Sequence, residues 1–184
     1  TFTATDSFSG TDSVSVTAGS YTDVTGNLGA AGSDNVTIDT LSPSVIVDIV
    51  DASLNDGDNS SVVTFTFSEA PVDFTAADIT AVGGTVSGLT VTADPLVYTA
   101  TFTATDGFSG TGSVAVTADS YTDAAGNTGA AGSDTVAIDR LNPLVAVNLV
   151  DGSLNDGDAS SQVTFTFRDR KSTRLNSSHD NTSR

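Results

Sequence analysis

Acidic side chains are the residues of this sequence whose number and spacing could support chemistry. The chain of 184 residues contains 23 aspartates and glutamates against six lysines and arginines, a formal net charge of −17. Up to Phe167 there is one base, Arg140, against 21 acids, so this part of the chain carries −20. Carboxylate oxygens are ligands that calcium prefers, and calcium takes six to eight oxygens. The same charge repels nucleic acid and anionic lipid, which excludes both as expected partners.

Side chains that serve as general bases or activated nucleophiles are nearly missing before residue 168. His, Cys and Lys do not occur there, and Glu69 is the only glutamate. A pair of aspartates could be assembled for glycoside hydrolysis, but loops that recur almost unchanged favour a repeated mechanical unit over one catalytic site. Aromatic platforms for carbohydrate are scarce, since there is no Trp and the only tyrosines in loops are Tyr121 and its copy Tyr21. We therefore predict that the chain is not an enzyme.

The elements that must position these acids recur along the chain at an offset of 100 residues. Residues 1–42 match residues 101–142 at 31 of 42 positions, and residues 143–167 repeat residues 43–67. A fixed offset without insertions is typical of a tandem array, and about 100 residues suffice for one domain with its own core. The prediction is a complete repeat at 43–142. It is flanked by the C-terminal part of a truncated repeat at 1–42 and the N-terminal part of another at 143–167.

Local patterns predict β-strands throughout the complete repeat. Apolar residues alternate with Thr, Ser and Asp, as in strands half buried in an antiparallel sheet. The predicted strands are 44–50, 62–68, 77–82, 85–91, 97–104, 112–118 and 134–139, and residues 74–79 could hold one helical turn. Seven short strands in about 100 residues indicate an all-β fold, an immunoglobulin-like antiparallel β-sandwich repeated in tandem. The predicted core includes Val47, Phe65, Phe67, Phe102, Val114, Val116 and Ile138.

Successive loops of such a sandwich alternate between its two poles, which divides the acids into two candidate sets of calcium ligands. The pole that leads to the next repeat is predicted to collect Asp51, Asp56, Asp58, Asp106 and Asp139. The opposite pole is predicted to collect Glu69, Asp94, Asp123 and Asn127, beside Asp39 of the preceding linker. The alternative interpretation is that these are solvated turn residues, because Asp and Asn are common in turns for local reasons.

Three stretches carry a more specific signal. The first is VTFTFSEAPVDFTAADI at 63–79. The second is TDAAGNTGAAGSDTVAID at 122–139, with a similar stretch at 22–39. The third is the linker pattern IDxLxP at 38–43 and 138–143. Together they resemble the bacterial immunoglobulin-like tandem repeats of large surface adhesins and biofilm-associated proteins, over residues 1–167. This resemblance implies an extracellular or cell-surface location and calcium at the junctions between domains.

The sequence changes character after Phe167. Where the repeat would continue SEAPVDF, the chain reads RDRKSTR and ends in LNSSHDNTSR. The string KSTRLNSSH resembles translated sequencing-adapter read-through, and a genuine basic tail is the alternative. Residues 168–184 offer little apolar area to offset the entropy lost on ordering, so we predict a disordered, non-native tail.

The predicted function is a non-enzymatic stalk or adhesion repeat of a bacterial extracellular or cell-surface protein, stiffened by calcium at its domain junctions. The expected partners are neighbouring repeats of the same chain, together with a host or abiotic surface or other adhesins. No run of about 18 apolar residues is present, so insertion into a membrane is not expected. The alternative is a spacer or accessory binding domain of a secreted hydrolase, and the full open reading frame would separate the two.

Overall fold

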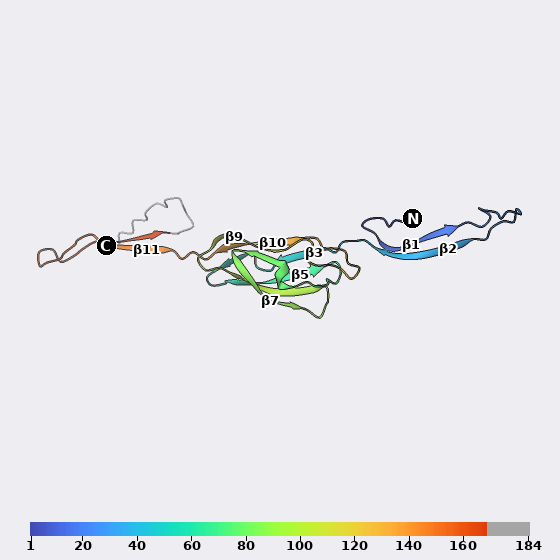
Figure 1. Ribbon diagram of the computed structural model, residues 1–184. Helices are drawn as coiled ribbons and strands as arrows, with labels where there is room; N and C mark the ends of the chain where they lie inside the picture. Colours follow the sequence, from blue (N-terminus) through green and yellow to red (C-terminus); the bar gives the residue numbers. More distant parts are fainter. Residues whose placement is uncertain (169–184) are drawn as a thin grey trace.

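The computed structural model describes residues 1–168, which form β-strands and one short 3₁₀ turn. A central sandwich carries one β-hairpin at each end, and the whole is elongated (Figure 1). The first hairpin is β1 (Ser9–Val16) and β2 (Gly32–Asp39), and the last is β11 (Leu144–Leu149) and β12 (Val163–Arg168). Among residues 1–168, no helix has the length and apolar character needed to cross a bilayer.

Two four-stranded sheets make up the sandwich, one in the order β3-β5-β8-β7 and the other β4-β10-β9-β6. Their strands are β3 (Val45–Ile49), β4 (Ser53–Asn55), β5 (Ser60–Phe67), β6 (Ile79–Val82), β7 (Gly84–Val91), β8 (Val97–Ala104), β9 (Ser109–Val116) and β10 (Gly132–Asp139). Neighbouring strands are antiparallel, except that β4 and β10 are parallel. The predicted all-β sandwich is confirmed.

The core lies between the two sheets and follows from the alternation along each strand. In β5, Val63, Phe65 and Phe67 are buried, while the residues between them face outward or are half buried. Phe74 packs edge-on against Phe67 with 4.9 Å between ring centroids, and it also meets Tyr98 at 5.3 Å. All seven predicted core residues are buried. Burying aromatic rings of this size supplies much of the stability of a small β-domain.

One strand of the sandwich has no counterpart in the prediction. β4 lies where the sequence LNDGDNS predicts only a turn, and its side chain Leu54 is buried. Its register pairs Leu54 with Ile138 of β10. The turn residues of this segment do not indicate a strand, because a parallel pair between segments this far apart in the chain forms only through long-range packing.

β7 contains a bulge. Its register with β8 shifts between Ser87 and Thr90, so that Val86 pairs with Phe102 and Val91 pairs with Tyr98, and Val91 is exposed near the end of this edge strand. Gly88 permits this shift because it adopts φ +68°, a conformation that glycine reaches without strain. The predicted helical turn within 74–79 is present as the 3₁₀ turn η1 (Ala76–Asp78).

The terminal hairpins repeat the strand pairing of the sandwich. β1 pairs with β2 in the register that joins β9 to β10, so that Val14 faces Asp34 as Val114 faces Asp134. At the other end, Arg168 pairs with Leu144 and therefore belongs to β12. The rest of the predicted tail, residues 169–184, lies outside the described residues.

Candidate functional site

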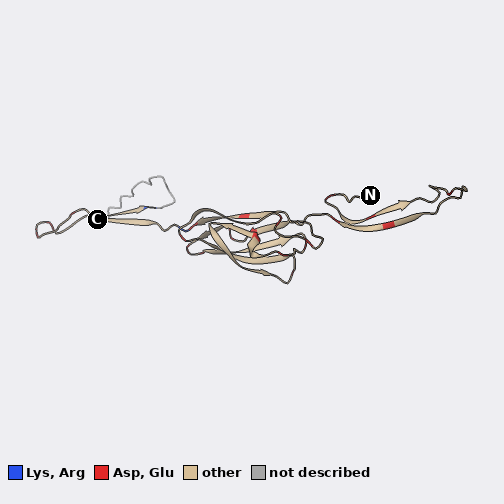
Figure 2. Cartoon of the chain, in the orientation of Figure 1, with Lys and Arg blue, Asp and Glu red and all other residues tan. Residues whose placement is uncertain are grey.

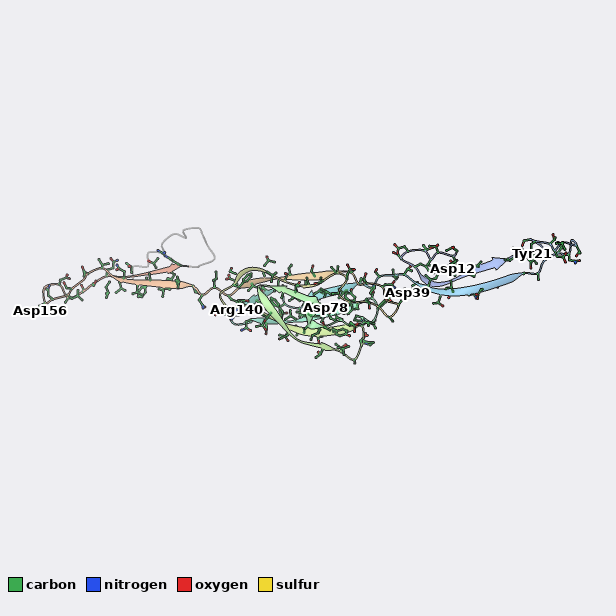
Figure 3. All side chains as sticks on the ribbon, viewed as in Figure 1. Asp12, Tyr21, Asp39, Asp78, Arg140 and Asp156 are labelled. Atoms are coloured by element: carbon green, nitrogen blue, oxygen red, sulfur yellow. The ribbon has the colours of Figure 1, made fainter. Side chains whose placement is uncertain are left out.

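Three carboxylates from distant parts of the chain converge at the pole where the chain enters the sandwich. Asp39 ends β2, Glu69 follows β5, and Asp123 lies in the loop between β9 and β10. One oxygen of each lies within 4.8 Å of the others. Figure 3 shows Asp39 at the junction between the first hairpin and the sandwich. Acids occur along the whole described chain (Figure 2), so convergence rather than abundance distinguishes this group, here called the junction triad.

Asp123 is buried and is fixed by its own loop. Its Oδ1 accepts hydrogen bonds from the backbone N–H groups of Ala125 at 2.8 Å and Asn127 at 2.9 Å. Its Oδ2 accepts one from the Asn127 side-chain amide at 2.8 Å. Burial alone would raise the pKa of Asp123, but these hydrogen bonds outweigh it and hold the pKa below its usual value. The carboxylate is therefore charged and pre-positioned.

Asn127 connects this loop to the linker that enters the sandwich. Its Nδ2 donates a second hydrogen bond, at 3.2 Å, to the backbone carbonyl of Asp39. The counterpart amide of Asn27 donates instead to Thr25 within its own loop, at 2.9 Å. Position 125 is alanine, which has no hydroxyl to compete for the amide. The linker is thus held directly by the domain that follows it.

Glu69 is the member of the triad whose charged form is disfavoured by its surroundings. It lies half-buried in the segment between β5 and η1. Its pKa is raised, first by burial and then by the negative charges of Asp39 and Asp123. A carboxyl that is pushed toward its neutral form by two neighbouring carboxylates would ionise fully beside a cation.

The three carboxylates of the junction triad suit calcium both in the type of their ligand atoms and in the distances between their oxygens. Oxygens bound to one calcium lie 2.3–2.6 Å from it, so any two of them are at most about 5 Å apart, and the triad oxygens meet that limit. Three carboxylates can supply up to about six oxygens, leaving places for carbonyls or water. Asp123 Oδ2 accepts one hydrogen bond and keeps a second lone pair free. Nitrogen and sulfur ligands, which softer metals select, are missing from the triad.

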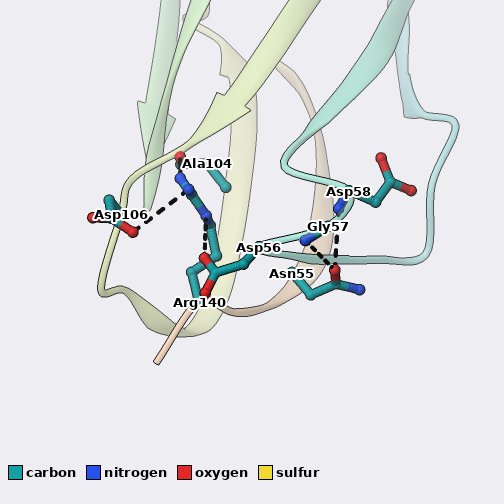
Figure 4. A network of polar contacts seen from close by, with 7 residues as sticks. All are labelled: Asn55, Asp56, Gly57, Asp58, Ala104, Asp106 and Arg140. Atoms are coloured by element: carbon teal, nitrogen blue, oxygen red, sulfur yellow. Dashed lines mark hydrogen bonds and ion pairs between the residues drawn. The ribbon is translucent and has the colours of Figure 1, made fainter. Parts of the chain in front are cut away.

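The opposite pole is organised around Arg140 rather than around a group of carboxylates alone. Its Nε lies 3.2 Å from Asp56, its Nη2 lies 3.5 Å from Asp106, and its Nη1 donates to the Ala104 carbonyl (Figure 4). The sequence predicts Asp56 and Asp106 as calcium ligands, and that prediction does not take the guanidinium of Arg140 into account. Arg140 offsets one of these two negative charges, so the pair attracts a cation less strongly than two carboxylates without an arginine would.

The other predicted ligands do not belong to a group of three carboxylates among the described residues. Asp58 points away from Arg140 (Figure 4). Asp51 and Asp139 are half-buried, and Asp94 is exposed, where it accepts a hydrogen bond from the Leu96 N–H of its own turn. Within the described residues, the junction triad is the one place where three such side chains could share an ion.

Arg140 is absent from the residues that the sequence predicts at this pole, although the sequence contains a signal for it. It is the single base before residue 168, and it replaces Thr40 of the preceding repeat. A lone arginine next to a linker aspartate, in a chain this acidic, points to an acidic partner nearby.

Tyr121 is not a surface platform. It is 1 % exposed, and its hydroxyl donates to the Ala130 carbonyl at 3.0 Å, with the Pro43 carbonyl at 3.3 Å. Its ring lies directly over Gly129, where a Cβ would overlap it. Tyr121 therefore anchors the loop that carries Asp123, and it cannot stack on a sugar.

Comparison with models of protein families identifies the family of the sandwich. A family model described as a bacterial Ig-like domain matches residues 39–140. The matched segment starts at Asp39 and includes all three members of the junction triad. No curated protein matches the chain.

Proposed function

Because the chain belongs to the bacterial Ig-like domain family, we propose that it is a stalk segment of a bacterial extracellular protein, with calcium fixing the junction at Asp39. Domains of this family are extracellular-type repeat domains and are typically non-catalytic. The observation that carries the proposal is the convergence of Asp39 with Glu69 and Asp123, which joins a linker carboxylate to two carboxylates of the following domain.

Electrostatics explain why a cation would matter at this position. The triad places three like charges together in a chain of net charge −17, so without a cation the linker and the domain repel each other. A divalent ion turns this repulsion into a shared ligand set. The buried Pro43, directly after the linker, already restricts the chain, and Asn127 holds the Asp39 carbonyl. Calcium would then hold one angle between adjoining domains.

A stalk of this kind acts through stiffness, and its partners are the neighbouring repeats of the same chain. Stiff repeats hold an adhesive region away from the cell, where it can meet a host surface, an abiotic surface or another adhesin. Extracellular calcium modules bind at roughly 10⁻⁴–10⁻³ M. Such a junction would be rigid in calcium-rich surroundings and loose where calcium is scarce.

Calorimetric titration of the full chain with calcium, together with thermal unfolding in calcium and in chelator, tests the proposal. We expect binding in the millimolar range or tighter. At about 100 times the dissociation constant, one site adds about 2.7 kcal/mol to the free energy of unfolding. Glu69→Gln should remove most of this gain without removing a described hydrogen bond. Asp94→Asn, an equal change of charge outside the triad, should keep it.

Small-angle X-ray scattering of the same samples measures stiffness. The chain should be longer and less variable in calcium than in chelator, and Glu69→Gln should show no difference between the two. No binding at millimolar calcium would refute the calcium site, and an equal loss in Asp94→Asn would mean that calcium only screens the overall charge.

A further inference from the structure

An aspartate followed by glycine can rearrange its own backbone without an enzyme. The glycine nitrogen attacks the side-chain Cγ, and the new N–Cγ bond forms as a C–O bond of the carboxyl breaks and water leaves. Water then opens the five-membered imide at one of its two carbonyls. Opening at the α-carbonyl breaks the original peptide bond and leaves the chain running through Cβ and Cγ, which is isoaspartate. Glycine favours the attack because it has no Cβ beside the nitrogen and its backbone turns freely.

Two of the four Asp–Gly pairs in the sequence lie in the central sandwich. Asp56–Gly57 is in the loop between β4 and β5, and Asp106–Gly107 is in the turn between β8 and β9. Both aspartates approach Arg140 (Figure 4). Because the two pairs have the same residue types and share this neighbour, a difference in their reactivity must come from the surrounding structure.

The backbone nitrogen of Gly57 is engaged in a hydrogen bond. Its N–H donates to Asn55 Oδ1 at 2.8 Å, and the same oxygen accepts from the Asp58 N–H at 3.1 Å (Figure 4). An asparagine that bonds the backbone two residues ahead is a common turn device. This hydrogen bond must break before the nitrogen can turn towards the carboxyl, so the Asn55 side chain protects Asp56.

The backbone nitrogen of Gly107 is open by comparison. Within residues 1–168 no hydrogen bond engages its N–H, and the bond that closes the turn runs from the Phe108 N–H to the Thr105 carbonyl at 3.3 Å. Gly107 has φ +70°, and apart from its chain neighbours no atom lies within 4 Å of the place a Cβ would take. The Asp106 side chain is 82 % exposed. The nitrogen, the carboxyl and water can therefore meet.

Arg140 adds a second difference between the two aspartates. Its Nε donates a hydrogen bond to Asp56 at 3.2 Å, whereas its Nη2 lies 3.5 Å from Asp106. A carboxyl must rotate towards the glycine nitrogen before it can react, and a hydrogen bond from the guanidinium opposes that rotation. The longer contact leaves Asp106 freer to rotate than Asp56.

We propose that Asp106 is a site of spontaneous isoaspartate formation. The hydrogen bond between Gly57 and Asn55 prevents the same rearrangement at Asp56. One water leaves and one returns, so the product keeps the mass and the negative charge of the original chain. The reaction needs no oxidant or cofactor, and it depends neither on calcium nor on a role as a stalk.

The product changes the pole from which the chain leaves the sandwich. Isoaspartate adds a methylene to the backbone of the turn and moves the carboxylate onto the α-carbon. The ion pair between Asp106 and Arg140 should therefore be lost, while Arg140 keeps its contacts with Asp56 and the Ala104 carbonyl. The turn is altered next to the residue that begins the outgoing linker.

Peptide mapping by mass spectrometry tests the proposal on the full chain after long incubation in water enriched in the heavy oxygen isotope. Each passage through the imide inserts one heavy oxygen, so the label reports the route as well as the rate. In the folded chain, isoaspartate and label should appear at Asp106 about fivefold faster or more than at Asp56, since one hydrogen bond must first break at Gly57. In denaturant the two aspartates should react at similar rates.

Variants test the role of each residue. Asn55→Ala frees the Gly57 N–H and should raise the rate at Asp56 towards that at Asp106, whereas Asn55→Asp keeps an acceptor and should not. Asp106→Glu should stop the reaction at that position, because its ring would need six members. Equal rates at Asp56 and Asp106 in the folded chain, or no isoaspartate at Asp106, would overturn the proposal. Continued protection of Asp56 in Asn55→Ala, with thermal unfolding showing that the variant is folded, would refute the role of Asn55.

Discussion

Residues 21–29 and 121–129 form the same loop in different surroundings. In both, the backbone N–H of the glycine at the end donates to the tyrosine carbonyl at 2.8 Å, and the aspartate Oδ1 accepts from the asparagine N–H at 2.9 Å. Yet Tyr21 is 54 % exposed and Tyr121 is 1 % exposed. The loop conformation is therefore a property of the local sequence, whereas burial depends on strands that come from elsewhere.

The two aspartates of these loops show how surroundings change a charge. Hydrogen bonds from Asn27 and Thr25 hold the pKa of Asp23 far below its usual range, with little burial to oppose them. At Asp123 burial works against the hydrogen bonds, and the neighbouring Glu69 and Asp39 complete a group that Asp23 lacks. The local turn makes a charged carboxylate, and the fold turns it into part of a candidate site.

The largest difference between the two settings should appear at the core phenylalanines. Phe65→Ala should lower the free energy of unfolding by about 3–5 kcal/mol, because it leaves a cavity between two packed sheets. Phe165→Ala should change it by less than about 0.5 kcal/mol in dilute solution, since that ring is largely exposed. Denaturant unfolding of the full chain measures both. Similar losses would mean that the hairpin is packed as the sandwich is.

The second largest difference is expected in the stability cost of replacing the glycine that lies beneath each tyrosine ring. A methyl group at either Gly129 or Gly29 would overlap the neighbouring tyrosine ring. Gly129→Ala should cost about 1–3 kcal/mol, because the buried Tyr121 cannot move away. Gly29→Ala should cost little, because the exposed Tyr21 can rotate into solvent. Thermal unfolding checks the pair, and an equal cost would contradict the steric explanation.

A smaller effect is expected from the tyrosine hydroxyls. Tyr121→Phe removes the hydrogen bond to the Ala130 carbonyl and should lower the free energy of unfolding by about 1 kcal/mol. Tyr21→Phe, its matched control, should have no measurable effect on the same unfolding transition. A neutral Tyr121→Phe would indicate that the hydroxyl is equally well satisfied by water in the unfolded chain.

The smallest effect concerns pH in the absence of calcium. The raised pKa of Glu69 means that its favourable contribution is fully present below its unfolded pKa and is lost as pH rises through its folded pKa. The lowered pKa of Asp123 acts in the opposite sense, with a contribution that is lost as pH falls through its folded pKa. In chelator, Glu69→Gln should therefore gain stability relative to the unchanged chain as pH rises from mildly acidic to neutral. A pH-independent difference between the two in thermal unfolding would rule out this charge repulsion.

Much of the fold could be predicted because its signals are local. Alternation of Val, Phe and Thr predicts each long strand, and turn residues predict most of the connections. Leu54 shows the limit, since a buried residue within a turn sequence is recognisable only once β10 lies beside it. The bulge in β7 shows another, because the alternation of residue types does not reveal that the register with β8 shifts between Ser87 and Thr90.

The candidate site was accessible from the sequence only in part. The alternation of loops between poles predicts that Glu69, Asp94, Asp123 and Asn127 share one end of the domain with Asp39. The structure brings Asp39, Glu69 and Asp123 together. Their role as calcium ligands stays a prediction. At the other end, Asp56 and Asp106 face Arg140, a pairing that depends on the direction of one long side chain.

The sequence by itself determined the repeat, the strands, the acidic charge and the self-bonded loop at Asp123, because each depends on residues a few positions apart or on a simple offset. The tertiary structure alone decided which apolar faces are covered and which carboxylates meet. Those outcomes require segments far apart in the chain to be brought together, as Asp39 and Asp123 are at the junction. Two hairpins with nearly the same residues as the central repeat remain open, because burial comes from the strands that pack against a face and not from the face itself.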